Sequence, residues 1–357
     1  MSISLTEASK LSTDILLKGI IETIVKDSPI LQELPFIQIV GNSLKYNREK
    51  TLPTVAWYDP VTDTWTTSEP EFEQCSASLC ILGGDADVDN FLRATRNNIQ
   101  DLEAAVIEQK AKALRNEFEN TFLNGDSSVN TKQPDGLYKT MKGTAWQAST
   151  AYSLGDVVVP TAGNENGFRY ECTSAGTSDA SEPTWPTAEG ETVDDNTVTW
   201  TCRFGNHLGS GANGATFTLS KIDQLIDLVR GGKPDLLLMS RRSRRKIAAL
   251  SRAAGSNLQV GQGKLGEFVE LYNGIPVAIS DWVKDNYVVG TSTDCSAIFA
   301  FQMGEGAVCG LTSPEIIQVE RLGSLETKDA FRTRVKWYVS LANFSIVKAA
   351  MLTGVRD

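Results

Sequence analysis

The sequence predicts an α+β fold that is divided by a small all-β insertion domain. Helical patterns before residue 125 and after residue 218 alternate with short segments rich in β-forming residues. Between them, residues 145–204 shift in composition toward Thr, Ser, Gly, Glu and aromatic side chains, which is typical of short strands joined by turns. With 357 residues, the chain is long enough for two or three folding units.

The N-terminal segment, residues 1–36, predicts a short amphipathic helix followed by an extended arm. Apolar residues recur at helical spacing from Leu5 to Val25, and Pro29 and Pro35 then interrupt regular structure. The first twenty residues lack the uninterrupted apolar core of a signal peptide, and no stretch approaches the roughly 18 apolar residues that a bilayer crossing needs. We therefore expect neither secretion by that route nor a membrane protein.

Residues 37–84 predict a long, protruding hairpin. β-forming residues from Ile37 to Tyr46 and from Phe72 to Leu82 flank a polar stretch that contains several prolines. Such a hairpin buries little against its own chain, so we expect a neighbouring subunit to complete its contacts. The candidates for these intersubunit contacts are Lys45, Arg48, Lys50 and Trp57.

Residues 85–144 contain the strongest helical pattern, which runs from about Asp89 to Asn124 and would be on the order of 50 Å long. We expect this helix to be a structural spine. The run Asp85-Ala86-Asp87-Val88-Asp89-Asn90 begins like a calcium loop. However, Asn90 replaces the sixth-position glycine and Arg96 replaces the twelfth-position glutamate, which favours helix capping by Asp87 or Asp89 instead.

After the insertion, residues 205–310 begin with a Gly-rich linker, Gly205 to Gly214. Helical spacing then resumes from Leu219 to Val229, a buried strand follows at Leu236–Met239, and a second helix covers Ser240 to Ala254. Alternating strands continue through residues 311–357. The string Gly261-Gln262-Gly263-Lys264 hints at a phosphate-binding loop but lacks the remaining residues of that motif, so we interpret it as a flexible loop.

The second of these helices carries the one dense basic run of the sequence. Arg241, Arg242, Arg244, Arg245 and Lys246 would spread around more than half of its circumference. We expect a solvated or intersubunit face that pairs with acidic neighbours, with Arg241, Arg242 and Arg245 as candidate intersubunit contacts; DNA contact is the alternative. The 44 acidic residues against 34 basic ones give a net charge of -10, which argues against a protein devoted to gripping nucleic acid.

The residues that would support catalysis or metal binding are sparse. The six cysteines contain no Cys-x-x-Cys pair, so we do not expect a zinc site. We expect the thiols to be free and mostly buried. Cys172 and Cys202 are the one pair that could be joined. His207 is the sole histidine and has no sequence neighbour that would complete a catalytic triad. We therefore expect no enzyme and no cofactor.

Several strings, in a common order, resemble the Hong Kong 97 fold of tailed-bacteriophage major capsid proteins. Outside the insertion the resemblance covers nearly the whole chain. It is carried by the arm, the extended loop, the long helix, and the following strings: Asn124-Gly125-Asp126, Pro134-Asp135-Gly136-Leu137, Pro234-Asp235 through Met239-Ser240, Tyr272-Asn273-Gly274-Ile275-Pro276-Val277, Arg332 through Tyr338, and Lys348-Ala349-Ala350.

This resemblance implies a non-catalytic coat protein that assembles into the icosahedral head enclosing double-stranded DNA. By the resemblance, residues 85–144 hold the spine helix and the first part of a peripheral domain, residues 205–310 are mainly an axial domain, and residues 311–357 return to the peripheral domain. Pentamers and hexamers of this chain, a portal, a decoration protein and assembly in the host bacterial cytoplasm are further implications. Because the sequence begins almost at the arm, a scaffolding protein is expected to be separate or absent. The lysine-to-asparagine crosslink of the family cannot be matched here.

Residues 145–204 resemble a second group, the small aromatic β modules of carbohydrate-binding families 5 and 12. The matching residues include Trp146, Tyr152, Tyr170, Trp185 and Trp200. These aromatics would either form the core of the module or contact glycans. The resemblance to capsid proteins implies that the module lies on the outer surface of the shell. An encapsulin-like bacterial compartment and a carbohydrate-binding protein are the alternative functions.

Overall fold

The computed structural model describes residues 29–59, 62–91, 94, 102–255, 259–262, 268–315 and 317–356. The expected helix between Leu5 and Val25 lies outside these residues. Within them the fold is a mixture of helices and strands, which confirms the predicted α+β class.

The first sheet lies against the spine helix, α4 (Leu102–Asn124). Its long strand β20 pairs with β4 along one edge and with β18 and β19 along the other. Phe118 and Phe122 of α4 pack against Val335, Trp337 and Val339 of β20 in one buried cluster. The strands of this sheet are β1 (Phe36–Gln38), β4 (Cys80–Asp89), β18 (Val308–Thr312), β19 (Gln318–Ser324) and β20 (Ala330–Asn343).

The second and larger sheet is covered on both faces. Its neighbouring strands run in the order β13-β14-β15-β12-β17-β21-β10-β7-β6, and β9, β11 and β16 pair at its sides. These strands are β6 (Val157–Val158), β7 (Asn166–Ser174), β9 (Thr192–Asp195), β10 (Val198–Gly209), β11 (Ala215–Thr216), β12 (Leu236–Met239), β13 (Gln259–Gln262), β14 (Phe268–Tyr272), β15 (Ile275–Ile279), β16 (Tyr287–Val289), β17 (Ser292–Phe301) and β21 (Ala349–Arg356).

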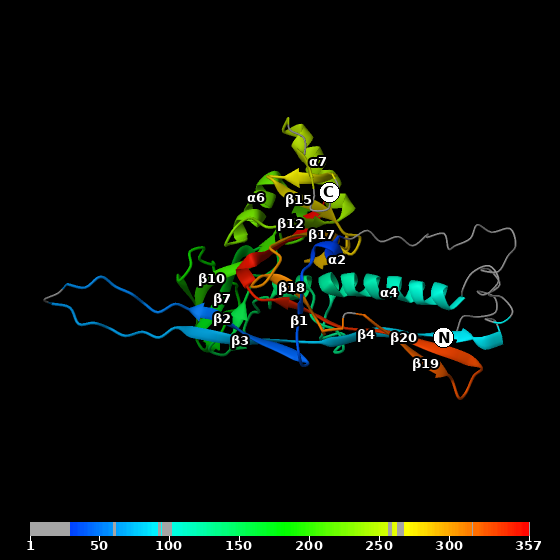
Figure 1. Ribbon diagram of the computed structural model, residues 1–357. Helices are drawn as coiled ribbons and strands as arrows, with labels where there is room; N and C mark the ends of the chain where they lie inside the picture. Colours follow the sequence, from blue (N-terminus) through cyan, green and yellow to red (C-terminus); the bar gives the residue numbers. More distant parts are fainter. Residues whose placement is uncertain are drawn as a thin grey trace.

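The apolar run Leu236–Met239 explains how this sheet is buried on both faces. Leu236 and Leu238 join the cluster that contains the spine helix, whereas Leu237 and Met239 join the cluster under α6 (Leu219–Leu228) and α7 (Arg241–Ala253). Because successive strand residues point to opposite faces, an uninterrupted apolar run is what a strand buried on both sides requires. Figure 1 shows α6 and α7 together at one end of the body and α4 on the other side of the sheet.

The insertion has its own small core but shares a strand with the body. Trp146, Tyr170, Trp185 and Trp200 are buried in one cluster with neighbouring apolar residues. The short strands β5 (Ala151–Tyr152) and β8 (Gly176–Thr177) pair with each other, and β10 pairs with β7 and β9 inside the insertion. The same β10 then continues and pairs in parallel with β21 of the body at His207↔Met351. The expectation of a Gly-rich linker is therefore wrong over residues 205–209, because these residues belong to a buried strand.

The segment predicted as a hairpin, residues 37–84, forms a hairpin only in its central part, because β1 and the start of β4 pair within the first sheet. Strands β2 (Ser43–Thr51) and β3 (Glu71–Ser78) form a separate two-stranded ladder that ends at the Thr51↔Glu71 pair. Figure 1 shows the hairpin projecting far beyond the body, with residues 52–59 and 62–70 toward its free end. The remaining short elements are α2 (Ile30–Glu33), α5 (Leu137–Lys142) and a 3₁₀ turn at Ile346–Lys348.

Three local expectations are corrected by the structure. The segment before the spine helix is strand β4 up to Asp89, so Asp87 is not a helix cap; only Asp89 accepts a hydrogen bond from a following backbone amide, that of Phe91. Gly261 and Gln262 belong to β13 and do not lie in a flexible loop; Lys264 lies outside the described residues.

The third correction concerns residues 311–357, which the resemblance assigned together to the peripheral domain but which divide between the two sheets. Strand β20 lies in the first sheet, and β21 lies in the middle of the second sheet. The last eight described residues therefore belong with residues 205–301, not with the preceding strand.

The strings Asn124-Gly125-Asp126 and Pro134-Asp135-Gly136-Leu137, at the two ends of the loop after α4, contact each other. The backbone amide of Gly136 donates to the carbonyl oxygen of Gly125 over 2.9 Å. A Cβ atom on Gly125 would lie 2.4 Å from the carbonyl oxygen of Pro134, so only glycine allows this approach. The end of the spine helix is thus fixed by the second string.

Candidate functional site

The free end of the hairpin exposes large apolar side chains. These are Leu52, Val55, Trp57, Trp65 and, at the start of β3, Phe72. The two sides of the tip contact each other, because the rings of Tyr58 and Trp65 stack with centroids 4.4 Å apart and the amide of Thr54 donates to the Ser68 hydroxyl over 2.6 Å. The described residues of the tip therefore form an apolar surface that no other described part of the chain covers.

The charge of the hairpin end has one sign. Between residues 51 and 78 the sequence has acidic residues at Asp59, Asp63, Glu69, Glu71 and Glu73 and contains no lysine or arginine. Like charges on a slender projection repel one another and keep it extended in water. A surface that receives the tip would therefore combine apolar contacts with basic residues.

The base of the hairpin is bound to the body by one face of β2. The Tyr46 hydroxyl donates to the carbonyl oxygen of Asn343 over 3.2 Å, and Arg48 Nε donates to that of Phe344 over 2.9 Å. Lys50 Nζ lies 2.7 Å from Glu171 Oε1 of the insertion. Arg48 and Lys50, predicted as intersubunit contacts, therefore have partners in their own chain, whereas Lys45 and Trp57 are exposed.

The basic run of α7 is mostly paired within the chain. Arg241 Nε lies 2.8 Å from Asp281 Oδ1, and Arg242 donates to the Asp294 carbonyl oxygen over 2.7 Å and approaches Asp285 at 3.5 Å. Arg244 forms a two-bond ion pair with Glu270. Of the three arginines predicted to contact a neighbouring subunit, Arg245 is the one for which no ion pair to a described residue is found. Arg245 is an exposed residue.

The carboxylates that resembled the start of a calcium loop face arginines of β20. Arg332 binds Asp87 through two bonds of 2.6 Å, and Arg334 binds Asp85 through bonds of 2.6 and 3.0 Å. Hydrogen bonds from Arg332 and Arg334 lower the pKa of Asp87 and Asp85, respectively. No group of three potential metal ligands occurs among the residues that the structure describes. The alternating acidic residues of β4 thus serve to pair it with β20.

The five aromatic residues singled out in the insertion lie in its interior. Trp146, Tyr170, Trp185 and Trp200 are buried, and Tyr152 is half-buried with its ring edge against Trp200. Both Trp146 Nε1 and Trp200 Nε1 donate to Asp195 Oδ2, over 2.8 and 3.0 Å. This arrangement supports the core-packing interpretation, because an aromatic platform for sugar rings has to be exposed.

The single histidine is buried at the junction of the insertion and the body. His207 Nε2 lies 2.8 Å from the Thr353 hydroxyl and 4.0 Å from Glu165 Oε1. Burial lowers the pKa of His207 to about 4 and raises that of Glu165, so the imidazole is neutral near pH 7. All six cysteines are free, Cys172 and Cys202 included. His207, Glu165 and the four cysteines Cys172, Cys202, Cys295 and Cys309 are buried, which suits packing better than catalysis, whereas Cys75 and Cys80 are partly exposed.

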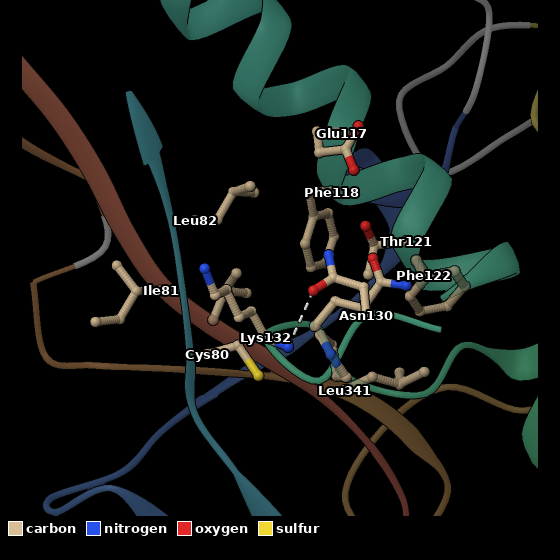
Figure 2. Close-up of a pocket in the computed structure, with 13 residues that line it drawn as sticks. Cys80, Ile81, Leu82, Glu117, Phe118, Thr121, Phe122, Asn130, Lys132 and Leu341 are labelled. Carbon is tan, nitrogen blue, oxygen red and sulfur yellow. Dashed lines mark hydrogen bonds between the residues drawn. The ribbon is translucent and has the colours of Figure 1, made fainter. Parts of the chain in front are cut away.

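An apolar cavity of about 140 Å³ lies between α4, β4 and the end of β20. Figure 2 shows Phe118 and Phe122 of the helix on one side and Ile81 and Leu82 of β4 on the other. Its volume is well below the roughly 300–1,000 Å³ of pockets that enclose small-molecule ligands. It is a gap in the packing under the spine helix, and Asn130, Lys132 and Gln133 of the loop after α4 also line it.

Sequence reasoning missed the charged residues that join the hairpin to the insertion. Glu171, Arg203 and Arg169 lie on β7 and β10, and their alternation with Tyr170 and Cys202 shows that they share the face opposite the aromatic core. That alternation was readable in the sequence. The partner of Glu171 was not, because Lys50 belongs to a distant segment.

The described helices include none that is long and apolar enough to cross a membrane. A search of curated proteins found no match. Among solved structures, the SrpI encapsulin of Synechococcus elongatus PCC 7942 has a TM-score of 0.62 at 14% identity, covering 99% of this chain and 96% of its own.

Two further structures are viral or virus-like shells. The capsid of an empty GTA particle has a TM-score of 0.59 at 13% identity, covering 99% of this chain and 98% of its own. The capsid of Myoviridae phage XM1 has a TM-score of 0.60 at 12% identity, covering 96% of this chain and 97% of its own. At such low identity these likenesses show a shared, Hong Kong 97-like fold.

The family is shown by sequence. The profile described as the phage capsid family matches residues 12–322, which is most of the chain and includes the hairpin, the spine helix and both helices of the second sheet. This chain therefore belongs to the phage capsid family, a family of structural proteins of the capsid shell.

Proposed function

We propose that many copies of this chain tile the closed icosahedral head of a tailed phage, with each hairpin reaching over a neighbouring subunit. The observation that carries the proposal is the hairpin end, residues 52–70. It exposes Trp57, Trp65, Leu52 and Val55 on a projection that no other described part of the chain covers.

Burial between subunits would give these side chains the environment they lack in one chain. Fully burying a single large apolar side chain stabilises by about 1.5–3 kcal/mol, so a few such residues per subunit can drive association. Basic residues such as Lys45 and Arg245 are exposed elsewhere on the molecule and complement the acidic tip. A repeated contact between a tip and a different surface is heterologous, and it produces closed assemblies when the rotation between copies closes.

Electron microscopy of the expressed chain, alone and with a scaffolding protein, tests the proposal. The decisive variant replaces residues 52–70 with Asn-Gly, which suits the two-residue turn left between Thr51 and Glu71. We expect this variant to keep the unfolding temperature of the parent chain, because the tip contacts little of the body, and to form no shells.

A second variant separates the apolar contacts from the shape of the tip. Trp57→Ser with Trp65→Ser keeps the length and charge of the hairpin, and we expect it to shift the assembly threshold to higher protein concentration. The proposal is wrong if the shortened variant forms shells as readily as the parent chain.

The remaining features of the proposal concern what surrounds the shell. We propose pentamers and hexamers of this chain, double-stranded DNA as the contents without sequence-specific binding, a portal, a separate scaffolding protein, a decoration protein and assembly in the host bacterial cytoplasm. The net charge of -10 supports DNA as the enclosed material, because the inner surface of a DNA container should not adhere to the DNA. The inserted module, residues 145–204, is proposed to lie on the outer surface.

An encapsulin-like compartment is the second candidate, since the SrpI encapsulin shares the fold over 99% of this chain. The gene neighbourhood discriminates between the two. Terminase and portal genes are expected beside a phage capsid gene, whereas a cargo enzyme gene would indicate a compartment. Nuclease-protected DNA in particles from the natural source would decide for the phage head.

A further inference from the structure

The inserted module contacts the hairpin at the last point before it becomes free. Tyr46 and Arg48 alternate along β2, so their side chains share one face of the strand, and the ladder is then irregular at Lys50, between Glu49 and Thr51. Tyr46 and Arg48 reach the end of β20 in the body, at Asn343 and Phe344. Lys50, one step further out, reaches the insertion instead.

The receiving group is a buried carboxylate shared by two cations. Glu171 lies between Lys50 Nζ at 2.7 Å and Arg203 Nε at 3.0 Å. Burial by itself would raise the pKa of Glu171, but the hydrogen bonds from Lys50 and Arg203 outweigh burial and lower it. Glu171 is therefore ionised near neutral pH, and a carboxylate in this position needs its cations.

The charges on this face of the insertion are also out of balance without the hairpin. Arg203 lies directly opposite Arg169 in the β10–β7 ladder, a like-charge pair that is unfavourable by itself. Burial lowers the pKa of Arg169, and the carboxylate of Glu73 on β3 opposes this shift. Glu73 also lies 3.9 Å from Arg48. The hairpin thus supplies both a cation for Glu171 and an anion for the arginines.

We infer that the inserted module acts as a brace, which fixes where the hairpin leaves the body and in which direction it points. Without the brace, the last side-chain contact of β2 with the body would be that of Arg48, about 6.6 Å or two residues closer to the base. This role concerns a single chain and does not depend on the proposed shell.

Because the free end is long, the position of its tip depends strongly on the angle at which the hairpin leaves the body. Each side of the free end, residues 52–59 and residues 62–70, projects by roughly 30 Å at strand spacing. A change of ~10° at the base would then move the tip by ~5 Å, enough to misplace an apolar contact. A brace at Lys50 would therefore matter for any partner that the tip meets.

Amide hydrogen exchange of the unassembled full chain tests the inference. Lys50→Gln removes the cation from Glu171, and we expect the amides of residues 43–51 and 71–78 to exchange about 2- to 5-fold faster, the range for a partly exposed ion pair. Lys45→Gln is the matched control, because it makes the same charge change on the exposed face of the same strand. It should leave the exchange rates as they are in the parent chain.

Glu171→Gln and the double variant Lys50→Gln/Glu171→Gln complete the cycle. Glu171→Gln should accelerate exchange in the hairpin as Lys50→Gln does. The double variant should add much less than the full Lys50→Gln effect to that of Glu171→Gln, because only the longer contact of Lys50 with Glu71, at 3.7 Å, is then left to lose. Emission from the buried tryptophans of the insertion reports whether the module itself stays folded. The inference is overturned if Lys50→Gln behaves like Lys45→Gln, or if the two effects add fully. Because the chain is measured unassembled, neither result depends on whether shells form.

Discussion

Asp195 holds the core of the inserted module together, and its removal gives the sharpest test of that core. The buried Asp195 carboxylate accepts hydrogen bonds from the indole nitrogens of Trp146 and Trp200 and from the backbone amide of Asp179, the last over 2.8 Å. Asp195→Ala would leave these donors without their acceptor inside an aromatic cluster.

The expected cost follows from the number of buried donors. Each buried donor left unsatisfied costs about 1–3 kcal/mol, so losing both indole bonds would destabilise the module by about 2–6 kcal/mol. The cavity left by the shortened side chain adds to this cost. A module of this size has little stability to spare, so local unfolding is the expected result.

Hydrogen exchange of residues 145–204 measures this loss, and tryptophan emission follows the exposure of the indoles. Asp194→Ala is the matched control, because the carboxylate of Asp194 is exposed and bonds the hydroxyl of Thr199. We expect the control to stay within about 0.5 kcal/mol of the parent chain. A cost below about 0.5 kcal/mol for Asp195→Ala would refute the reasoning that Asp195 supports the tryptophan pair.

Three further predictions concern the body. Because the bonds from Arg332 lower the pKa of Asp87, their contribution to stability is present above about pH 4 and is lost as the pH falls toward the lowered pKa. The unfolding temperature of Asp87→Asn, measured by circular dichroism, should therefore fall less between pH 5 and pH 3 than that of the parent chain. Phe118→Ala enlarges the cavity under the spine helix and should cost about 3–5 kcal/mol in denaturant unfolding, whereas an unchanged midpoint would contradict the packing shown in Figure 2. Gly274 has φ 79° in the turn between β14 and β15, so Gly274→Val should lower the unfolding temperature, while Gly274→Asn should lower it less.

Local patterns in the sequence were sufficient to predict much of the fold. The four-residue apolar run at Leu236–Met239 indicated a buried strand, and Ser240 was the expected start of the helix that follows. The structure agrees, since the Ser240 hydroxyl accepts a hydrogen bond from the amide of Ser243 over 3.2 Å. These features depend on residues close together in the chain, so short-range rules describe them.

The candidate site was predictable only in part. The exposed tip with Trp57 followed from its polar, proline-containing sequence, which offers no periodic apolar face. That Arg48 and Lys50 would be held within the chain did not follow, because their partners lie in β20, the residues just after it, and β7. Charged residues on a hairpin look alike in sequence whether they face solvent, the same chain or a neighbour.

By itself the sequence determined the α+β class, the spine helix, the projecting hairpin and an aromatic module whose residues are spaced for a small β core. The tertiary structure alone decided that the glycine-rich segment after this module is a buried strand, because its partner β21 lies at the other end of the chain. It also decided that Asp87 pairs with Arg332 and that Lys50 pairs with Glu171. Periodicity records which face of an element is apolar, but the choice of a distant partner depends on how the folded chain brings the two segments together.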